Sequence, residues 1–171
     1  MTYRSIRMAL AIFVAAAVAT PAMAQEPPGK LSAAEIAKIT AEVTEGVVTY
    51  GRVFSERNPK GVVEGSFNQP SFSIGASGVA MNVPEKQIAQ FGATQKRLAD
   101  SGWEKSVFSK MSVCVLNANA ALASGLFTRY RKDASVHSEG SETFIFTRTK
   151  DGWRIVSTIG HDAFKTVTCS Y

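Results

Sequence analysis

The chain has 171 residues, with 19 basic and 14 acidic side chains, two cysteines and two histidines. This length predicts one domain, and the mild excess of positive charge argues against binding to nucleic acid or to a membrane surface. The few cysteines and histidines, without a C-x-x-C pattern, provide no ligand set for a metal cluster or a covalent haem, so we expect no cofactor.

The first 24 residues are typical of a secretory signal peptide. Arg4 and Arg7 precede an apolar run, which Pro21 and the small-residue site Ala22-Met23-Ala24 follow. The run is too short and too interrupted for a membrane span, although an uncleaved anchor helix is the alternative. We predict cleavage after Ala24, a linker at residues 25–31, and a periplasmic or secreted protein that is not held in a membrane.

A long amphipathic helix is predicted to open the domain. Ser32 and Glu35 form a capping-box pattern, in which each side chain satisfies a backbone N–H of the other residue. Apolar residues then recur every three or four positions as far as Phe54, as expected for a helix with one buried face. Asn58-Pro59 predicts the N-cap and the first residue of a short second helix.

A hairpin and a third helix are predicted next. Apolar residues from Phe72 to Val83 flank a turn at Gly75–Gly78, which is typical of a β-hairpin. Pro84 is favoured in the first turn of a helix and Gly102 at its C-terminal end. The segment between them is therefore predicted to be helical.

Four long strands are predicted after the third helix, at residues 103–117, 118–131, 141–150 and 152–161. Asp151-Gly152 predicts a two-residue turn between the last two strands, because both residues tolerate positive φ. His137 is placed in a polar, exposed loop before the third of these strands.

Cys114 and Cys169 are candidates for a disulfide that ties the C-terminal tail, residues 163–171, to the sheet. Disulfides form and persist in the oxidising compartments to which a signal peptide leads. Two free thiols, with Cys114 as a buried apolar residue, are the alternative.

The order of these elements, the Asn58-Pro59 step, the strand NAALASGLFTRY and the hairpin DGWRIVS resemble the nuclear transport factor 2-like superfamily, in its SnoaL-like and ketosteroid isomerase-like branch. The resemblance covers about residues 33–162, and we set the domain at residues 32–162. It implies an α+β cone, in which a strongly curved, mostly antiparallel sheet wraps around the long N-terminal helix, with three helices in total. The open end of the cone is a pocket in this family.

The resemblance also implies a homodimer through the outer face of the sheet. Apolar residues stand on more than one side of the predicted strands, for example Val107, Met111, Val113, Phe144 and Phe146. A sheet covered on one face only is expected to alternate more cleanly.

Isomerases of this family place a tyrosine on the first helix and a carboxylate base at the end of the first strand. Tyr50 matches the tyrosine position, whereas Ile74 falls near the position of the base and cannot take a proton. General acid–base chemistry needs a titratable group within reach of the substrate. Glu142 is the one remaining carboxylate that can reach the pocket, and a solvated charge at its rim is the alternative.

His161 and Asp162 adjoin each other at the end of the last strand. Strand alternation places His161 on the same face as Ile155 and Asp162 on the opposite face, so the two cannot orient each other as an acid–base pair. His161 is predicted to face the mouth of the cone alone, and a histidine at a frayed strand end is the alternative. Alternation likewise separates Tyr130 from Arg129, so at most one of these meets the pocket.

The candidate pocket residues are therefore Tyr50, Ser73, Tyr130, Glu142 and His161, and no residue is assigned as catalytic. A hydrogen-bond donor without a base indicates recognition of a small molecule and no carboxylate-based catalysis. One alternative is an isomerase, dehydratase or hydrolase that acts on a small carbonyl or polyketide-like substrate. The other is a dimeric protein-interaction domain with a filled cone.

Overall fold

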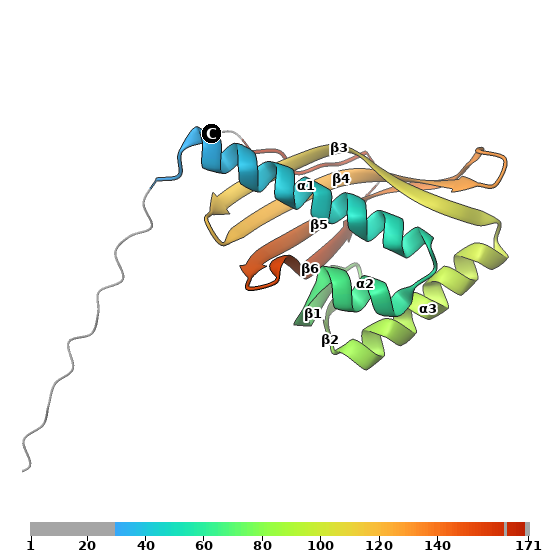
Figure 1. The fold of residues 1–171 in the computed structure, drawn as a ribbon. Helices are drawn as coiled ribbons and strands as arrows, with labels where there is room; N and C mark the ends of the chain where they lie inside the picture. The colour runs from blue at the N-terminus through green and yellow to red at the C-terminus, as the bar shows by residue number, and fades with distance from the viewer. Residues whose placement is uncertain (1–29, 163, 170–171) are drawn as a thin grey trace, which may run out of the picture.

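The computed structural model describes residues 30–162 and 164–169. The predicted signal peptide and most of the predicted linker lie outside the described residues. The described residues form three helices and six strands. The long strands follow the third helix (Figure 1). The helices are α1 (Ala33–Ser55), α2 (Pro59–Ser66) and α3 (Pro84–Asp100), and the strands are β1 (Phe67–Gly75), β2 (Gly78–Asn82), β3 (Trp103–Asn117), β4 (Ala120–Arg131), β5 (Val136–Thr149) and β6 (Gly152–His161).

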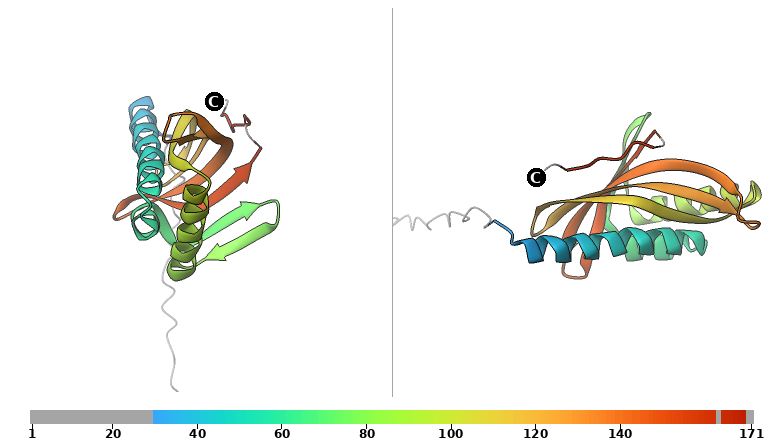
Figure 2. Two further views of the ribbon diagram at one scale, coloured as in Figure 1. Left: turned by 90° about the vertical axis from the view of Figure 1, so that its right-hand side faces the viewer. Right: turned by 90° about the horizontal axis from the view of Figure 1, so that it is seen from above.

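The six strands form one sheet in the order β2-β1-β6-β5-β4-β3. Every neighbouring pair is antiparallel except β1 and β6, which run parallel. Helix α1 lies on one face of this sheet, and the C-terminal tail lies on the opposite face (Figure 2). The predicted α+β cone, with three helices and a curved, mostly antiparallel sheet, is confirmed. In the described part of the chain, every helix is too short or too polar to span a bilayer.

Helix α1 begins at the predicted capping box. The Ser32 backbone N–H donates to Glu35 Oε2 at 2.8 Å, and the Glu35 N–H donates to Ser32 Oγ at 3.3 Å. Gly51 lies where the helix meets β3, since a Cβ atom there would come within 3.0 Å of the Phe108 ring. The glycine lets the helix pack closely on the strand. The buried face of α1 consists of Ile39, Val43, Val47, Tyr50, Gly51 and Phe54.

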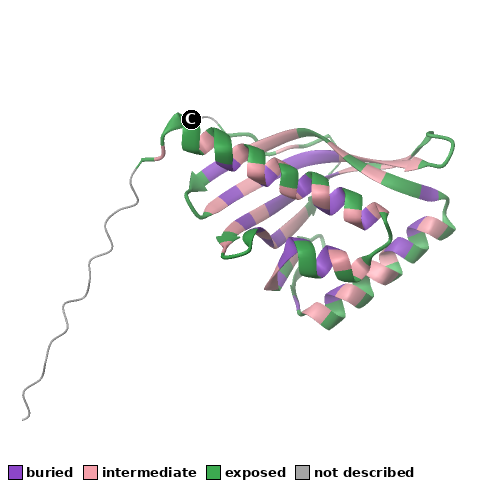
Figure 3. Cartoon of the chain, viewed as in Figure 1, coloured by how far each residue is buried: buried purple, intermediate pink, exposed green. Residues whose placement is uncertain are grey.

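Large and small side chains alternate across the inner face of the sheet. Phe144 on β5 pairs with Ala123 on β4, and Phe146 pairs with Ala121, all at most 2% exposed. Burial of each phenylalanine stabilises the fold by about 1.5–3 kcal/mol. The Tyr50 ring centroid lies 5.4 Å from that of Phe144, so one end of the cone is filled by aromatic packing. Figure 3 shows buried residues where α1 lies over the sheet.

Strand β5 begins at Val136, five residues before the predicted start of that strand at residue 141. His137, which we placed in an exposed loop, is therefore a half-buried strand residue, and its Nε2 lies 2.9 Å from Ser101 Oγ. The first residues of β5 are mostly polar, and strands were predicted from alternating apolar residues, so this end of the strand was not recognised. The turn before β6 is also shifted by one residue: Thr149 pairs with Gly152, and only Gly152 has positive φ.

The C-terminal tail is bonded to the sheet. Cys114 on β3 and Cys169 form a disulfide, as predicted, and no free cysteine is present among the described residues. The Val167 N–H donates to Ser124 Oγ on β4 at 3.0 Å. The tail therefore crosses the outer face of the sheet, opposite α1 (Figure 2).

Candidate functional site

The interior of the cone contains a cavity of about 220 Å³. This is below the range of about 300–1,000 Å³ typical of pockets for drug-sized ligands. Its walls come from α1, α3 and the strands β1, β2, β4, β5 and β6. The cavity is lined by the aromatic residues Tyr50, Phe54, Phe67 and Phe91, by the neutral polar residues Ser73, Asn82, Gln87, Gln90, Thr94 and Thr158, and by Arg129 and Glu142.

Three ionisable groups without hydrogen-bond partners among the described residues line this cavity: the Tyr50 hydroxyl, the Arg129 guanidinium and the Glu142 carboxyl. None of them makes a hydrogen bond or an ion pair with another described residue. The guanidinium carbon of Arg129 lies 4.4 Å from the centroid of the Phe127 ring, and its Nε is buried without an acceptor. Unpartnered polar groups in one cavity are the usual mark of a ligand site, because buried polar groups are otherwise satisfied.

Burial sets the protonation of these groups. It raises the pKa of Glu142 to about 7, a rise that the charge of Arg129 only partly opposes. It also raises the pKa of Tyr50, with the negative charge of Glu142 acting in the same direction. Near neutral pH the site therefore contains a guanidinium cation, a neutral phenol and a carboxyl group that exchanges its proton.

A polar network supports one wall of the cavity. Gln87 Oε1 on α3 accepts from Gln69 Nε2 at 2.7 Å and from Ser71 Oγ at 3.2 Å. Asn82 Nδ2 donates to Ser73 Oγ at 2.8 Å. The two bonds to Gln87 hold α3 against β1, and the bond from Asn82 joins the two strands of the hairpin, so the wall is preorganised for a ligand.

The polar residues of α3 were not predicted as pocket residues, because only apolar positions were used to place its inward face. Helical spacing from the apolar residues Phe91 and Leu98 extends to Gln87 and Thr94 at intervals of three and four residues. Polar residues on the inward stripe of a helix were therefore the available sign of a polar cavity wall.

The structure brings Tyr50, Ser73 and Glu142 together at one cavity. Tyr130 does not line it; Arg129, its neighbour on β4, lies there instead, as alternation requires of one of the two. Ile74, near the position of the expected base, is 36% exposed, while Ser73 lines the cavity.

Glu142 lies inside the cone, and the alternative of a solvated charge at the rim was wrong. Because β5 begins at Val136, Glu142 is in the middle of the strand and pairs with Gly125 of β4. A start at residue 141 would have left it at the strand end, where side chains are commonly solvated. The boundary error thus explains why a solvated position was kept as the alternative.

His161 does not face the cavity, and this part of the prediction was wrong. Ile145 pairs with Ser157 but Phe146 pairs with Ile155, so β6 contains an extra residue between these pairs. Such a bulge exchanges the faces of all later residues. His161 Nε2 consequently lies 2.9 Å from Thr143 Oγ1, which donates to Ser124 Oγ under the tail.

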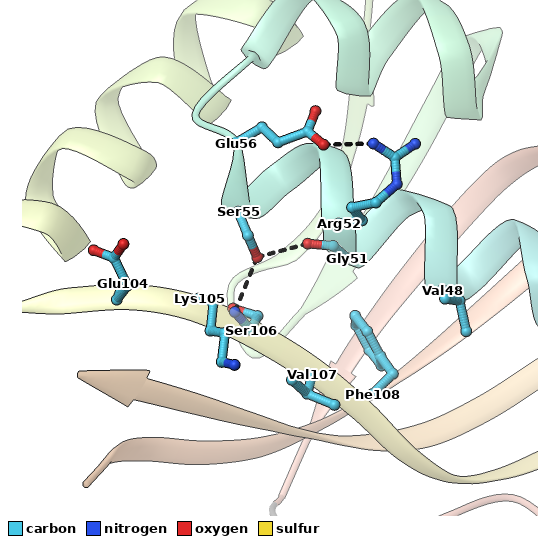
Figure 4. Close-up of a pocket in the computed structure, with 10 residues that line it drawn as sticks. All are labelled: Val48, Gly51, Arg52, Ser55, Glu56, Glu104, Lys105, Ser106, Val107 and Phe108. Carbon is cyan, nitrogen blue, oxygen red and sulfur yellow. Dashed lines mark hydrogen bonds and ion pairs between the residues drawn. The ribbon is translucent and has the colours of Figure 1, made fainter. Parts of the chain in front are cut away.

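A larger hollow of about 440 Å³ lies between α1 and β3 (Figure 4). Its polar groups are mostly paired within the protein. Arg52 forms an ion pair with Glu56, and Ser55 Oγ donates to the Gly51 carbonyl and accepts from the Ser106 N–H. We therefore assign the site to the smaller cavity, where Tyr50, Arg129 and Glu142 have no hydrogen-bond partner among the described residues.

Metal ligands are not gathered anywhere in residues 30–162 and 164–169: no group of three or more His, Cys, Asp or Glu side chains is placed to hold an ion. The ionisable groups that line the cavity are the phenol of Tyr50, the guanidinium of Arg129 and the carboxyl group of Glu142.

Comparison with known proteins agrees with this architecture. An NTF2-like protein with a cystatin-like fold from Novosphingobium aromaticivorans superposes with a TM-score of 0.62 at 18% identity, over 74% of this chain and 83% of its own. An NTF2-like superfamily protein from Salmonella enterica gives 0.56 at 22% identity, over 76% and 94%. A protein from Catenulispora acidiphila in complex with S-DNPA gives 0.57 at 14% identity, over 72% and 94%.

Among curated proteins, no sequence matches this chain. The profile of one family, described as NTF2-like protein (DUF6841), matches residues 41–163, which is most of the predicted domain. The chain therefore belongs to the NTF2-like protein (DUF6841) family.

Proposed function

We propose that the cone binds a compact small molecule through Tyr50, Arg129 and Glu142. The observation that carries this proposal is the convergence of three polar groups without protein partners on one cavity. A buried polar group without a partner costs about 1–3 kcal/mol, which a ligand that supplies the partner recovers. An open cavity also supports ligand binding over a protein-interaction domain with a filled cone.

The test is a thermal-shift screen of compact carbonyl, hydroxyl and carboxyl compounds. We expect at least one compound to raise the melting temperature, because it binds the folded state only. Tyr50→Phe removes the phenol donor and is expected to reduce the shift. Tyr130→Phe, a matched change outside the cavity, is expected to keep it. No shift with any compound, or equal shifts in both variants, contradicts the proposal.

A second candidate is an isomerase, dehydratase or hydrolase that acts on a small carbonyl compound. The pKa of Glu142, about 7, favours it, since a general base works best when its pKa is near the working pH. The Tyr50 hydroxyl would donate to the oxygen on which negative charge develops. A substrate whose turnover falls by about 10²-fold or more in Glu142→Gln, with binding retained, supports catalysis; unchanged turnover contradicts it.

We further propose that the protein acts outside the cytoplasm, in the periplasm or beyond. The disulfide supports this, because such bonds are rare in reducing compartments. Amino-terminal sequencing of the protein from a periplasmic or culture fraction is expected to begin at Gln25. Recovery in the cytoplasmic fraction with an intact amino terminus contradicts export.

A further inference from the structure

Arg129 lacks the acceptor that a half-buried guanidinium normally has. Its contact is with the Phe127 ring, its Nε is buried without a partner, and it makes no ion pair within the described residues. The aromatic contact offsets part of the lost hydration but supplies no hydrogen-bond acceptor. The guanidinium is a planar donor whose geometry matches a carboxylate.

The groups around Arg129 do not supply a full negative charge to balance its guanidinium at neutral pH. The groups that act on it are Tyr50 from α1, Arg97 from α3 and Glu142 from β5. Tyr50 is neutral near pH 7, and Arg97 adds a second positive charge. Glu142 supplies negative charge only when it is ionised, and its pKa of about 7 keeps much of it protonated at neutral pH.

One part of the cavity lining is aromatic and offers contact to an apolar body. Tyr50 and Phe54 on α1, Phe67 at the start of β1 and Phe91 on α3 line the cavity and pack against one another, with ring centroids 5.7–6.3 Å apart. The exposed edge of this cluster offers an apolar surface to a group smaller than a drug-sized ligand.

We propose that the ligand is a compact organic monocarboxylate with an apolar body, whose carboxylate accepts hydrogen bonds from Arg129 and Tyr50 while Glu142 is protonated. This rests on the proposed function of the cone and names the class of ligand. Binding is then coupled to proton uptake, because an ionised Glu142 both neutralises Arg129 and repels a second carboxylate.

Benzoate and benzamide are suitable probes, because they share size and shape and differ in charge. Calorimetric titration of the full mature chain at pH 6 and pH 8 measures both. We expect benzoate to bind about tenfold or more tightly than benzamide at pH 6. The affinity for benzoate is expected to fall about tenfold at pH 8, since benzoate stays ionised throughout this range and Glu142 does not stay protonated.

Two variants separate this mechanism from damage to the fold. Arg129→Met is expected to remove the preference for benzoate, whereas Arg131→Met, an exposed arginine on the same strand, keeps it. Glu142→Gln is expected to tighten benzoate binding at pH 8 and to abolish its pH dependence. A loss of structure weakens binding and cannot tighten it, so this sign is specific to the proposal.

Each outcome decides a different claim. If benzamide binds as tightly as benzoate, or if Glu142→Gln weakens benzoate at pH 8, the carboxylate proposal is wrong and the cone remains a binding site for neutral molecules. If neither probe binds and no compound in the thermal-shift screen binds, both this inference and the proposed function are wrong.

Discussion

The carboxyl group of Glu142 lies in a cavity where no described residue donates a hydrogen bond to it. Burial raises its pKa to about 7, because the ionised form loses hydration and only the charge of Arg129 partly compensates. The folded state therefore holds a proton on this residue that the unfolded chain, with a carboxyl pKa of about 4.5, releases.

This difference predicts a pH dependence of stability. The free energy of unfolding is expected to fall by about 3 kcal/mol as pH rises from 4.5 to above 7, because the unfolded state binds fewer protons in that window. Glu142→Gln removes this contribution, and the variant is expected to be more stable than the wild-type protein at pH 8. Urea denaturation at pH 5 and pH 8 measures it, with Glu139→Gln, an exposed change on β5, as control. If the free energy of unfolding changes by the same amount between pH 5 and pH 8 in all three proteins, the prediction is wrong.

Among the elements, the bulge in β6 sets which of its residues lie on each face of the sheet, and the disulfide-bonded tail covers part of one face. The bulge after Ile155 turns Ser157 and His161 to the outer face and Thr158 to the cavity. The tail then covers part of that outer face, held by the disulfide and by the bond from Val167 to Ser124. Ligand site and tail therefore lie on opposite faces.

The disulfide is expected to stabilise the fold without affecting the cone. It closes a loop with a sequence separation of 55 residues, for which loop entropy predicts about 4 kcal/mol and measured values are commonly 2–4 kcal/mol. The double variant Cys114→Ser/Cys169→Ser leaves neither thiol unpaired and is expected to lower the free energy of unfolding by about 2–4 kcal/mol. Urea denaturation measures this, and ligand affinity serves as the control. A loss below about 0.5 kcal/mol, or a loss of binding in the folded variant, contradicts this account.

At the scale of the whole molecule, the homodimer implied by the family resemblance stays a prediction. The apolar residues that suggested an exposed sheet face lie mostly inside: Phe144 and Phe146 are in the core, and Met111 and Val113 pack against it. Irregular pairing of β3 between Ser109 and Ser112 breaks the alternation on which that argument depended. The outer face still carries half-buried Leu122 and Ile145, which pair across β4 and β5 beside the tail.

We expect light scattering at micromolar concentration to give twice the mass of the mature chain. If the outer face forms the interface, the dimer dissociation constant changes in the Cys114→Ser/Cys169→Ser variant, because the freed tail uncovers more of this face. A monomer mass for the wild-type protein contradicts the dimer. A dimer whose dissociation constant is the same in both proteins places the interface elsewhere.

The features that could be predicted from the sequence are those that depend on neighbours along the chain. The capping box at Ser32, the apolar stripe to Phe54 and the break at Asn58-Pro59 were readable because caps and helical spacing act over a few residues. The family resemblance then gave the order in which these elements pack, and Tyr50 and Glu142 could be named as pocket candidates.

The face on which each strand residue lies depends on the tertiary structure. One extra residue in β6 places His161 on the face opposite the cavity. Because β5 begins five residues earlier than predicted, Glu142 lies in the middle of the strand and lines the cavity. A strand has a period of two, so a shift of a single residue exchanges its faces, and such shifts are set by pairing with strands distant in sequence. For the same reason the meeting of Tyr50, Arg129 and Glu142, which lie on three different elements, could be seen only in the folded molecule.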